Sequence, residues 1–218
     1  MTSYPAMTSE ELIDQLTFEV RPVGRNALVH RIWLGIALGS VFALLAVFWL
    51  GFRPDLWVAM HGFAFWMKWA YTASLALCAV AATAKLARPD AEKFGWGWVI
   101  LLPVVGLAVI SIAELAHTPS SQWLDMWLGK SWKICSLLVL LLSLPIFGGL
   151  LWSFRRLAPT RLRAAGATAG LTAGAWAATL YCLHCPEVSA IFVLTWYSLG
   201  IALASLVGAV LGPRLLRW

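Results

Sequence analysis

Six stretches of about twenty mostly apolar residues alternate with short polar connections along this chain of 218 residues. A helix that crosses the ~30 Å hydrocarbon core of a bilayer needs about 20 such residues, because each residue adds about 1.5 Å. The pattern therefore predicts an all-α membrane protein with a six-transmembrane-helix bundle at 31–218, preceded by an N-terminal segment at 1–30. The predicted spans are 31–52, 66–87, 95–115, 133–154, 164–184 and 190–211.

Composition and charge support this assignment. Hydrophobic residues make up 61% of the chain and charged residues 12%, against about 25% charged residues in ordinary globular domains. If both termini lie on one side of the membrane, that side carries all but four of the 16 Lys and Arg residues. Because cytoplasmic flanks hold such an excess, we predict that both termini are cytoplasmic. The net charge of +6 is then a topology signal beside anionic headgroups and needs no nucleic-acid partner.

The predicted spans offer little chemistry for transport. The last three have no Asp, Glu, Lys or Arg in their apolar cores, although ionisable groups at membrane depth are the usual mark of an ion pathway. Glu114 is the one acid close to a span interior, and we expect it to be structural. Lys68 and Lys85 lie near opposite ends of the second span, where long side chains can reach the interface.

Glycines recur at a spacing of four in the fifth predicted span, at Gly166, Gly170 and Gly174, and small residues recur similarly in the sixth. Small residues at this period let another helix backbone approach closely in lipid. The pattern indicates close packing of the last two helices or a homodimer, and it does not choose between them.

Three of the four cysteines fall at span ends on the side opposite the termini. Cys135 lies in the first turn of the fourth predicted span, and Cys182 and Cys185 lie in the last turn of the fifth. If these two helices pack together, the three thiols share one depth, and outside the cytoplasm they could be held as disulfides. Cys78, in the middle of the second span, is more simply a small core hydrophobe.

The residues leave three chemistries open for these thiols. Cys135 could form a disulfide with Cys185 or Cys182 if their Cα atoms come within about 7 Å. Thiolates of all three cysteines, together with His184, could bind a soft metal ion such as zinc or cadmium. The Cys182 and Cys185 pair could instead exchange disulfides catalytically.

The N-terminal segment contains one short amphipathic helix, predicted over residues 8–20. Thr8 and Glu11 form a capping box at its start. A helix this short is marginal alone in water, and its early residues are acidic, whereas helices that lie on membrane surfaces are usually basic. We therefore predict that it docks into a groove of a protein partner. Its apolar face consists of Leu12, Ile13, Leu16 and Val20.

A series of short motifs runs through almost the whole chain in a fixed order. They are Glu11-Leu12-Ile13, Arg21-Pro22-Val23, Trp66-Met67-Lys68, Lys85-Leu86-Ala87-Arg88-Pro89, Trp132-Lys133-Ile134-Cys135, Leu142-Ser143-Leu144-Pro145, Leu183-His184-Cys185-Pro186-Glu187, Trp196-Tyr197-Ser198-Leu199-Gly200 and the tail from Gly212 to Trp218. In this series the chain resembles the NrsF-type multi-pass anti-sigma factors, which hold an extracytoplasmic-function (ECF) sigma factor at the bacterial inner membrane. The His-Cys-Pro-Glu run is the most specific part of the resemblance.

The resemblance implies a regulator in the inner membrane that is not an enzyme and has no resident cofactor. The family's paired outer cysteines match Cys135 and Cys185, which would sense oxidant or heavy-metal stress. Its sigma-binding part matches the N-terminal segment, including Arg21 and Pro22. Cys182 is an addition to the family pattern, and it could compete with Cys185 or complete a three-thiol site for a transient soft metal ion. A thiol event would then shift the bundle between two arrangements and free the partner.

Two other functions compete with the regulator. A membrane thiol-disulfide oxidoreductase linked to quinone, of the DsbB or vitamin K epoxide reductase type, relays electrons through two cysteine pairs. Only three outer cysteines are present here, so a second pair cannot be assembled. A structural subunit of a larger membrane complex would show no regulatory effect when Cys135 or Cys185 is replaced by serine.

Overall fold

Helices account for every regular element in the computed structural model, which describes residues 8–18, 27–87, 97–154 and 161–216. The long helices are α2 (Ala27–Leu50), α4 (Phe63–Leu86), α5 (Leu101–Ala116), α7 (Trp132–Phe154), α8 (Leu162–Tyr181) and α10 (Ser198–Leu215). The short ones are α1 (Ser9–Phe18), α3 (Leu56–Ala59), α6 (Trp123–Leu128) and α9 (Ala190–Phe192). Two 3₁₀ turns, Gly97–Ile100 and Ser120–Gln122, and a π-helical turn, Val193–Tyr197, complete the set.

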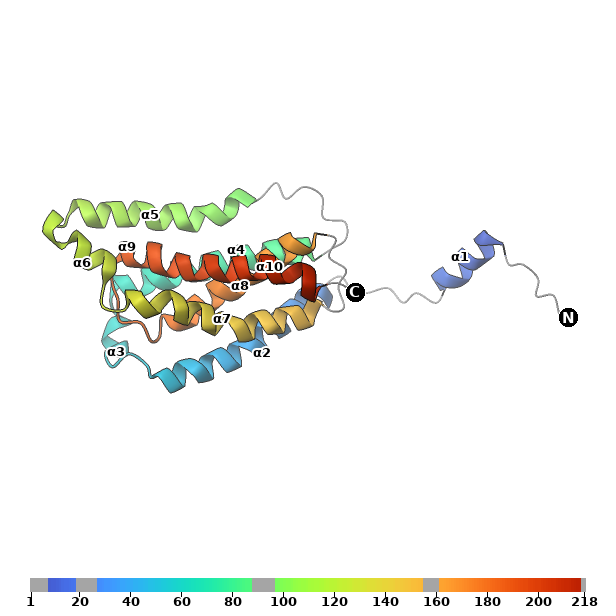
Figure 1. Cartoon of the computed structure of the whole chain (residues 1–218), viewed down its shortest axis with the longest axis horizontal. Helices are drawn as coiled ribbons and strands as arrows, with labels where there is room; N and C mark the ends of the chain where they lie inside the picture. The colour runs from blue at the N-terminus through green and yellow to red at the C-terminus, as the bar shows by residue number, and fades with distance from the viewer. Residues whose placement is uncertain (1–7, 19–26, 88–96, 155–160, 217–218) are drawn as a thin grey trace.

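The long helices run alternately in opposite directions between the two ends of one bundle (Figure 1). One end, which we call the α6 end, carries α3, α6 and the connection between α8 and α9. The other, which we call the C-terminal end, carries the start of α2 and the end of α10. This alternation follows from connections too short to do more than turn the chain back into the bundle.

Helix α1 stands apart from the bundle, beyond its C-terminal end (Figure 1). The amphipathic helix predicted at 8–20 is observed as Ser9–Phe18. Its capping box is also present, because the Thr8 amide donates to Glu11 Oε2 at 2.9 Å and the Glu11 amide donates to Thr8 Oγ1 at 3.4 Å. The hydrogen bonds to the Glu11 carboxylate lower its pKa.

Among the residues that the structure describes, five helical segments are long and apolar enough to cross a membrane, which indicates a membrane protein. They are Ala27–Leu50, Phe63–Leu86, Gly97–Ala116, Ser120–Phe154 and Ala190–Leu215. Each corresponds to one predicted span. The fifth predicted span is observed as α8, which has 20 residues but is not among the five. Its sequence explains this, because Ala, Gly and Thr make up most of it and contribute little apolar surface.

Helix α8 occupies the middle of the bundle and contacts α2, α4, α7 and α10. Its glycines allow α10 to approach at backbone distance. A Cβ atom added at Gly166 would collide with the carbonyl oxygen of Gly208, and one added at Gly170 would collide with that of Ala204. The glycine stripe is thus used for packing within the chain, so it gives no support to a homodimer.

Candidate thiol site

The structure places Cys135, Cys182 and Cys185 together at the α6 end of the bundle. Cys135 lies in the first turn of α7, where its amide donates to the Ser131 carbonyl at 2.9 Å. Cys182 directly follows α8, and the Cys185 amide donates to the Tyr181 carbonyl at 3.0 Å, which extends the helix by one more turn. All three side chains are completely buried and none forms a disulfide. We call these three residues the thiol cluster.

The members of the thiol cluster differ in their partners. The thiols of Cys135 and Cys185 interact with each other, and the Ser131 hydroxyl lies 4.0 Å from Cys185 Sγ. Cys182 instead turns back onto α8, where its Sγ donates to the Ala178 carbonyl at 3.3 Å. The geometry therefore separates a pair, Cys135 and Cys185, from a third thiol engaged with its own helix.

The electrostatic surroundings of Cys182 and Cys185 also differ. Burial raises the pKa of the Cys182 thiol to about 11. The pKa of Cys185 is lowered, first by the hydrogen bond from the Cys135 thiol and further by the nearby Lys68 ammonium. A hydrogen bond or a cation favours the charged form of an acid, whereas burial alone disfavours it. Cys185 is therefore the thiol whose anion this site stabilises.

Lys68 is a residue of this site whose role the sequence does not predict. The sequence predicts that it reaches toward the interface from the end of the second span, but its side chain is completely buried. From α4, its Nζ donates to the carbonyl oxygens of Cys185 at 3.1 Å and Glu187 at 2.5 Å. The one sequence feature that could have indicated burial of Lys68 is its place in the run Trp66-Met67-Lys68-Trp69, among bulky apolar residues.

Residues 182–189, which we call the 182–189 segment, contain Cys182 and Cys185 and are hydrogen-bonded to the residues just before α7. The Glu187 carboxylate accepts hydrogen bonds from the amides of Lys130 at 2.7 Å and Ser131 at 3.1 Å, and from the Ser131 hydroxyl at 3.1 Å. These amides lie at a helix N-terminus, where a carboxylate is favourable. The segment is thereby fastened to α4 through Lys68 and to α7 through Glu187.

Further hydrogen bonds tie the 182–189 segment to α2 and α5. His184 Nδ1 lies 2.6 Å from the Gly51 carbonyl, just after α2, and the Arg53 amide donates to the Leu183 carbonyl at 3.1 Å. On the other side, the Glu114 carboxylate of α5 accepts from the Ser189 hydroxyl at 3.3 Å, and also from the amide of Ala190, the first residue of α9, at 2.7 Å. Glu114 thus has the structural role expected of it. Four long helices are held at the α6 end by one short segment.

Two tyrosines border the thiol cluster. The rings of Tyr181 and Tyr197 are both buried, with their centroids 5.6 Å apart. The Tyr197 hydroxyl is buried without a conventional hydrogen-bond partner among the described residues, and it lies close enough to interact with Cys182 and Cys185. Tyr197 ends the π-helical turn Val193–Tyr197, a local feature that often marks a functional site. The sequence alone assigned neither tyrosine a chemical role.

The sequence predicts Cys135, Cys182, Cys185 and His184 as ligands of a soft metal ion. Thiolates are the donors that a soft cation prefers. However, within the described ranges no group of three or more His, Cys, Asp or Glu residues is placed to hold a metal ion. His184 directs its Nδ1 to the Gly51 carbonyl.

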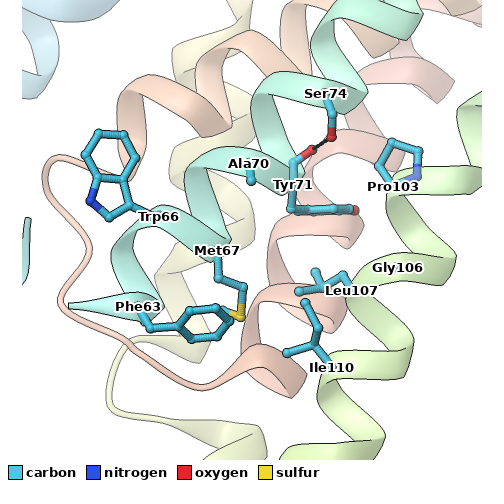
Figure 2. A pocket seen from close by; sticks show the side chains of 10 residues that line it. All are labelled: Phe63, Trp66, Met67, Ala70, Tyr71, Ser74, Pro103, Gly106, Leu107 and Ile110. Atoms are coloured by element: carbon cyan, nitrogen blue, oxygen red, sulfur yellow. Dashed lines mark hydrogen bonds between the residues drawn. The ribbon is translucent and has the colours of Figure 1, made fainter.

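A cavity of about 400 Å³ lies between α4 and α5 (Figure 2). Met67 and Tyr71 line it from α4, and Leu107 and Ile110 line it from α5, so its walls are largely apolar. No thiol of the described residues lines this cavity. Lys68, the neighbour of Met67 in sequence, reaches the 182–189 segment instead. The cavity is therefore separate from the thiol site.

The predicted partner-binding residues lie at the opposite end of the molecule or outside the described ranges. Leu12, Ile13 and Leu16 belong to α1, and Ile13 is 58% exposed. Val20, Arg21 and Pro22 fall outside the described residues. Phe18, which the predicted apolar face does not include, is 94% exposed at the end of α1.

Comparison with known proteins gives a match along nearly the whole chain. A family model described as "NrsF: Negative regulator of sigma F" matches residues 16–218. The chain is 40% identical over 214 residues to a protein of Azospira oryzae named "Probable anti-sigma-F factor NrsF". It is 41% identical over 215 residues to one of Caulobacter vibrioides named "Anti-sigma-F factor NrsF". Each alignment covers 97% of this chain and 100% of the relative. No solved structure matches the chain.

Proposed function

Because the chain belongs to the NrsF family of negative regulators of sigma F, we propose that it is a thiol-controlled anti-sigma factor of the bacterial inner membrane. It holds an ECF sigma factor through its N-terminal segment and releases it when the thiols of Cys135 and Cys185 are oxidised. Regulators of sigma factors are not enzymes, so the alternative of a quinone-linked oxidoreductase loses its support.

The proposed topology has six spans, which are the five apolar segments together with α8, and both termini in the cytoplasm. Three observations support it. The six long helices alternate in direction, α8 has the length of a span, and the Lys and Arg residues concentrate on the side of the termini. Helix α8 needs little apolarity of its own, because neighbouring helices surround it. The α6 end then faces the periplasm.

The observation that carries the proposal is the attachment of four helices to the segment that holds Cys185. Cys135 belongs to α7, Cys185 to the 182–189 segment, and Glu187 and Lys68 bind that segment to α7 and α4. A disulfide between Cys135 and Cys185 would fix the segment against the first turn of α7. The covalent bond would therefore change how the segment connects α4 and α7 at this end.

A disulfide can act as a signal only if it changes the relative free energies of two arrangements of the bundle. Coupling of about 1–3 kcal/mol changes partner affinity by roughly 5–150-fold. The long helices carry the change to the C-terminal end, where α2 begins and beyond which α1 lies. The family match begins at residue 16, whereas the alignments with the two relatives cover 97% of the chain. The assignment of Leu12 and Ile13 to the partner surface is supported by the amphipathic pattern of α1 and by the Glu11-Leu12-Ile13 motif.

The proposal is tested by purifying the protein from its native membrane and measuring the sigma factor bound before and after oxidant. We expect the sigma factor to be retained before oxidation and released afterwards. Cys135→Ser and Cys185→Ser should retain it permanently, whereas Cys78→Ser, in the middle of α4, should respond as the unmodified protein does. Ile13→Asp should weaken retention without oxidant.

Two results would count against this function. If no sigma factor is bound under either condition, the chain does not act as an anti-sigma factor. If the sigma factor is released equally from Cys135→Ser and Cys185→Ser, the thiols do not control it. A parallel sample with cadmium in place of oxidant separates the two inducing signals, and release by cadmium alone would require the thiol cluster to rearrange.

A further inference from the structure

Two cations interact with the thiol cluster, Arg53 and Lys68, and they have different kinds of hydrogen-bond acceptor. Arg53 forms a bidentate pair with Asp55, with Nε to Oδ1 at 2.8 Å and the second nitrogen to Oδ2 at 2.7 Å. Lys68 is completely buried and has two carbonyl oxygens as acceptors. Within the described part of the chain, no carboxylate pairs with it. Burying an ammonium without a counter-charge is costly, so this site favours a nearby anion.

The groups able to supply that anion are the thiols. Cys185 contributes its own carbonyl to Lys68 at 3.1 Å, and both Cys185 and Cys182 interact electrostatically with the ammonium. Cys182 donates its proton to the Ala178 carbonyl, a bond that a thiolate could not make. Cys185 can accept from the Cys135 thiol and lies near the otherwise unpartnered Tyr197 hydroxyl.

We propose that Lys68 is the positioning residue that holds Cys185 as a thiolate, so that Cys185 is the thiol that reacts first and Cys135 is the thiol that completes the disulfide. This inference rests on the proposed function and extends it, because it orders the two thiols and assigns the residue that sets the order. A cation beside a cysteine is a general means of making a buried thiol nucleophilic.

The reaction with hydrogen peroxide as the oxidant then follows in two steps. The Cys185 thiolate attacks one peroxide oxygen, the S–O bond forms, the O–O bond breaks, and the departing oxygen leaves as water after taking up a proton. Cys185 is now a sulfenic acid. The Cys135 sulfur attacks it, the S–S bond forms, and hydroxide leaves with the Cys135 proton as a second water. The two thiols lose two electrons in total, and the peroxide gains them.

Several packed elements contribute titratable or charged groups around Cys185 and Lys68. They are Cys135 from α7, Tyr181 from α8, Cys182, His184 and Glu187 from the 182–189 segment, Tyr197 from the π-helical turn, and Arg53 with Asp55 from the connection after α2. The Glu187 carboxylate accepts from the Ser131 hydroxyl, which also lies 4.0 Å from Cys185 Sγ, and from the amides of Lys130 and Ser131. Asp55 is largely exposed and already paired with Arg53. Among these groups Lys68 is the cation that lacks a carboxylate.

The test is a pH titration of thiolate absorbance in the ultraviolet, taken as the difference between the full-length protein and Cys185→Ser. We expect a midpoint below the ordinary cysteine value of about 8.5. In Lys68→Met the midpoint should rise by about one pH unit, which lowers the thiolate fraction at neutral pH by up to about tenfold. Lys85→Met, an exposed lysine at the other end of α4, is the matched control and should leave it unchanged.

A second measurement keeps the proposal falsifiable if Lys68→Met does not fold. After peroxide treatment of Cys135→Ser, a sulfenic-acid trap should label Cys185, and in Cys185→Ser it should not label Cys135. A midpoint for Cys185 at or above the ordinary value would overturn the proposal. So would an unchanged midpoint in folded Lys68→Met, or trapping at Cys135 instead.

These outcomes are distinct from failure of the proposed function. If oxidation releases a sigma factor but Lys68→Met does not change the titration, the ordering of the thiols is wrong and the function stands. If Lys68→Met shifts the titration of Cys185 as expected but no sigma factor is bound, Cys185 is established as the reactive thiol and the anti-sigma function fails.

Discussion

Helices α8 and α5 have opposite surroundings and opposite compositions. Helix α8 is rich in Ala, Gly and Thr, and 12 of its 20 residues are buried. The segment Gly97–Ala116, which contains α5, is far more apolar, yet only 11% of the residues in its most apolar stretch are buried in the protein. Since lipid is as apolar as a hydrophobic side chain, helix association in membranes depends on close packing of small residues. Apolarity here marks the helix that faces outward, and small side chains mark the helix at the centre.

The same contrast extends to the connections of the two helices. Beyond α8, the 182–189 segment is hydrogen-bonded to α4, to the start of α7 and to the connection after α2. Helix α5 contacts α4 and α9, and its Glu114 carboxylate accepts bonds from the residues around the start of α9. The thiols thus lie where many helices depend on one segment. A local chemical change there has consequences that a change on α5 would not have.

The largest expected effect comes from adding a side chain at the α8–α10 contact. In Gly170→Leu the new side chain meets the Ala204 backbone, which cannot move aside, and we expect a loss of about 3 kcal/mol or more, or failure to fold. Gly106→Leu on α5 is the control, because no atom lies within 4 Å of its added Cβ. Thermal unfolding in detergent measures both. Equal melting of the two variants would remove the distinction between a packed and an outward-facing helix.

A smaller effect is expected when the 182–189 segment is released from α7. Glu187→Ala removes the acceptor of three hydrogen bonds, and we expect it to lose about 1.5–3 kcal/mol, the range for bonds to a charged group. Glu187→Gln keeps an acceptor oxygen of the same shape and should recover part of the loss. The free energy of unfolding in a mild denaturant series is the measurement. Unchanged stability in Glu187→Ala would show that the segment is held by other contacts.

The smallest effect concerns a single hydrogen bond between α4 and α8. The Thr83 and Thr172 hydroxyls lie 2.9 Å apart and are buried. Thr83→Val keeps the shape and removes the bond, so we expect a loss of about 0.6 kcal/mol, typical of such bonds in membrane proteins. Ser111→Ala is the control on α5, because that hydroxyl donates only to its own helix at the Leu107 carbonyl. A loss for Ser111→Ala as large as for Thr83→Val would contradict this account.

The elements that could be predicted from sequence depend on local patterns. Apolar runs gave the positions of the long helices to within a few residues at most boundaries. The exceptions are the starts of α5, which begins at Leu101 after a 3₁₀ turn, and of α10, which begins at Ser198 after α9 and the π-helical turn. The capping box of Thr8 and Glu11 is visible as a four-residue motif and is present. Counting residues from the span ends placed the three outer cysteines at the same end of the bundle. Each of these inferences needs only neighbouring residues and the length of a helix.

The features that escaped prediction depend on tertiary contacts. Lys68 has acceptors 117 and 119 residues away in sequence, so nothing local distinguishes it from a lysine that reaches toward the interface. The π-helical turn that ends at Tyr197 has no local pattern that sets it apart from an ordinary helical turn. The role of Glu187 depends on the meeting of the 182–189 segment with Lys130 and Ser131. The central position of α8 could be suspected from its glycines, but the choice between an internal contact and a dimer required the structure.

The most direct test of the central claim measures two quantities in one membrane sample as peroxide is added stepwise. Peptide mass spectrometry gives the fraction of chains with a Cys135–Cys185 disulfide, and quantitative immunodetection gives the fraction of sigma factor still bound. We predict that the bound fraction falls in proportion to the rise of the disulfide. Release of the sigma factor without this disulfide, or complete disulfide formation with the sigma factor retained, would contradict the account.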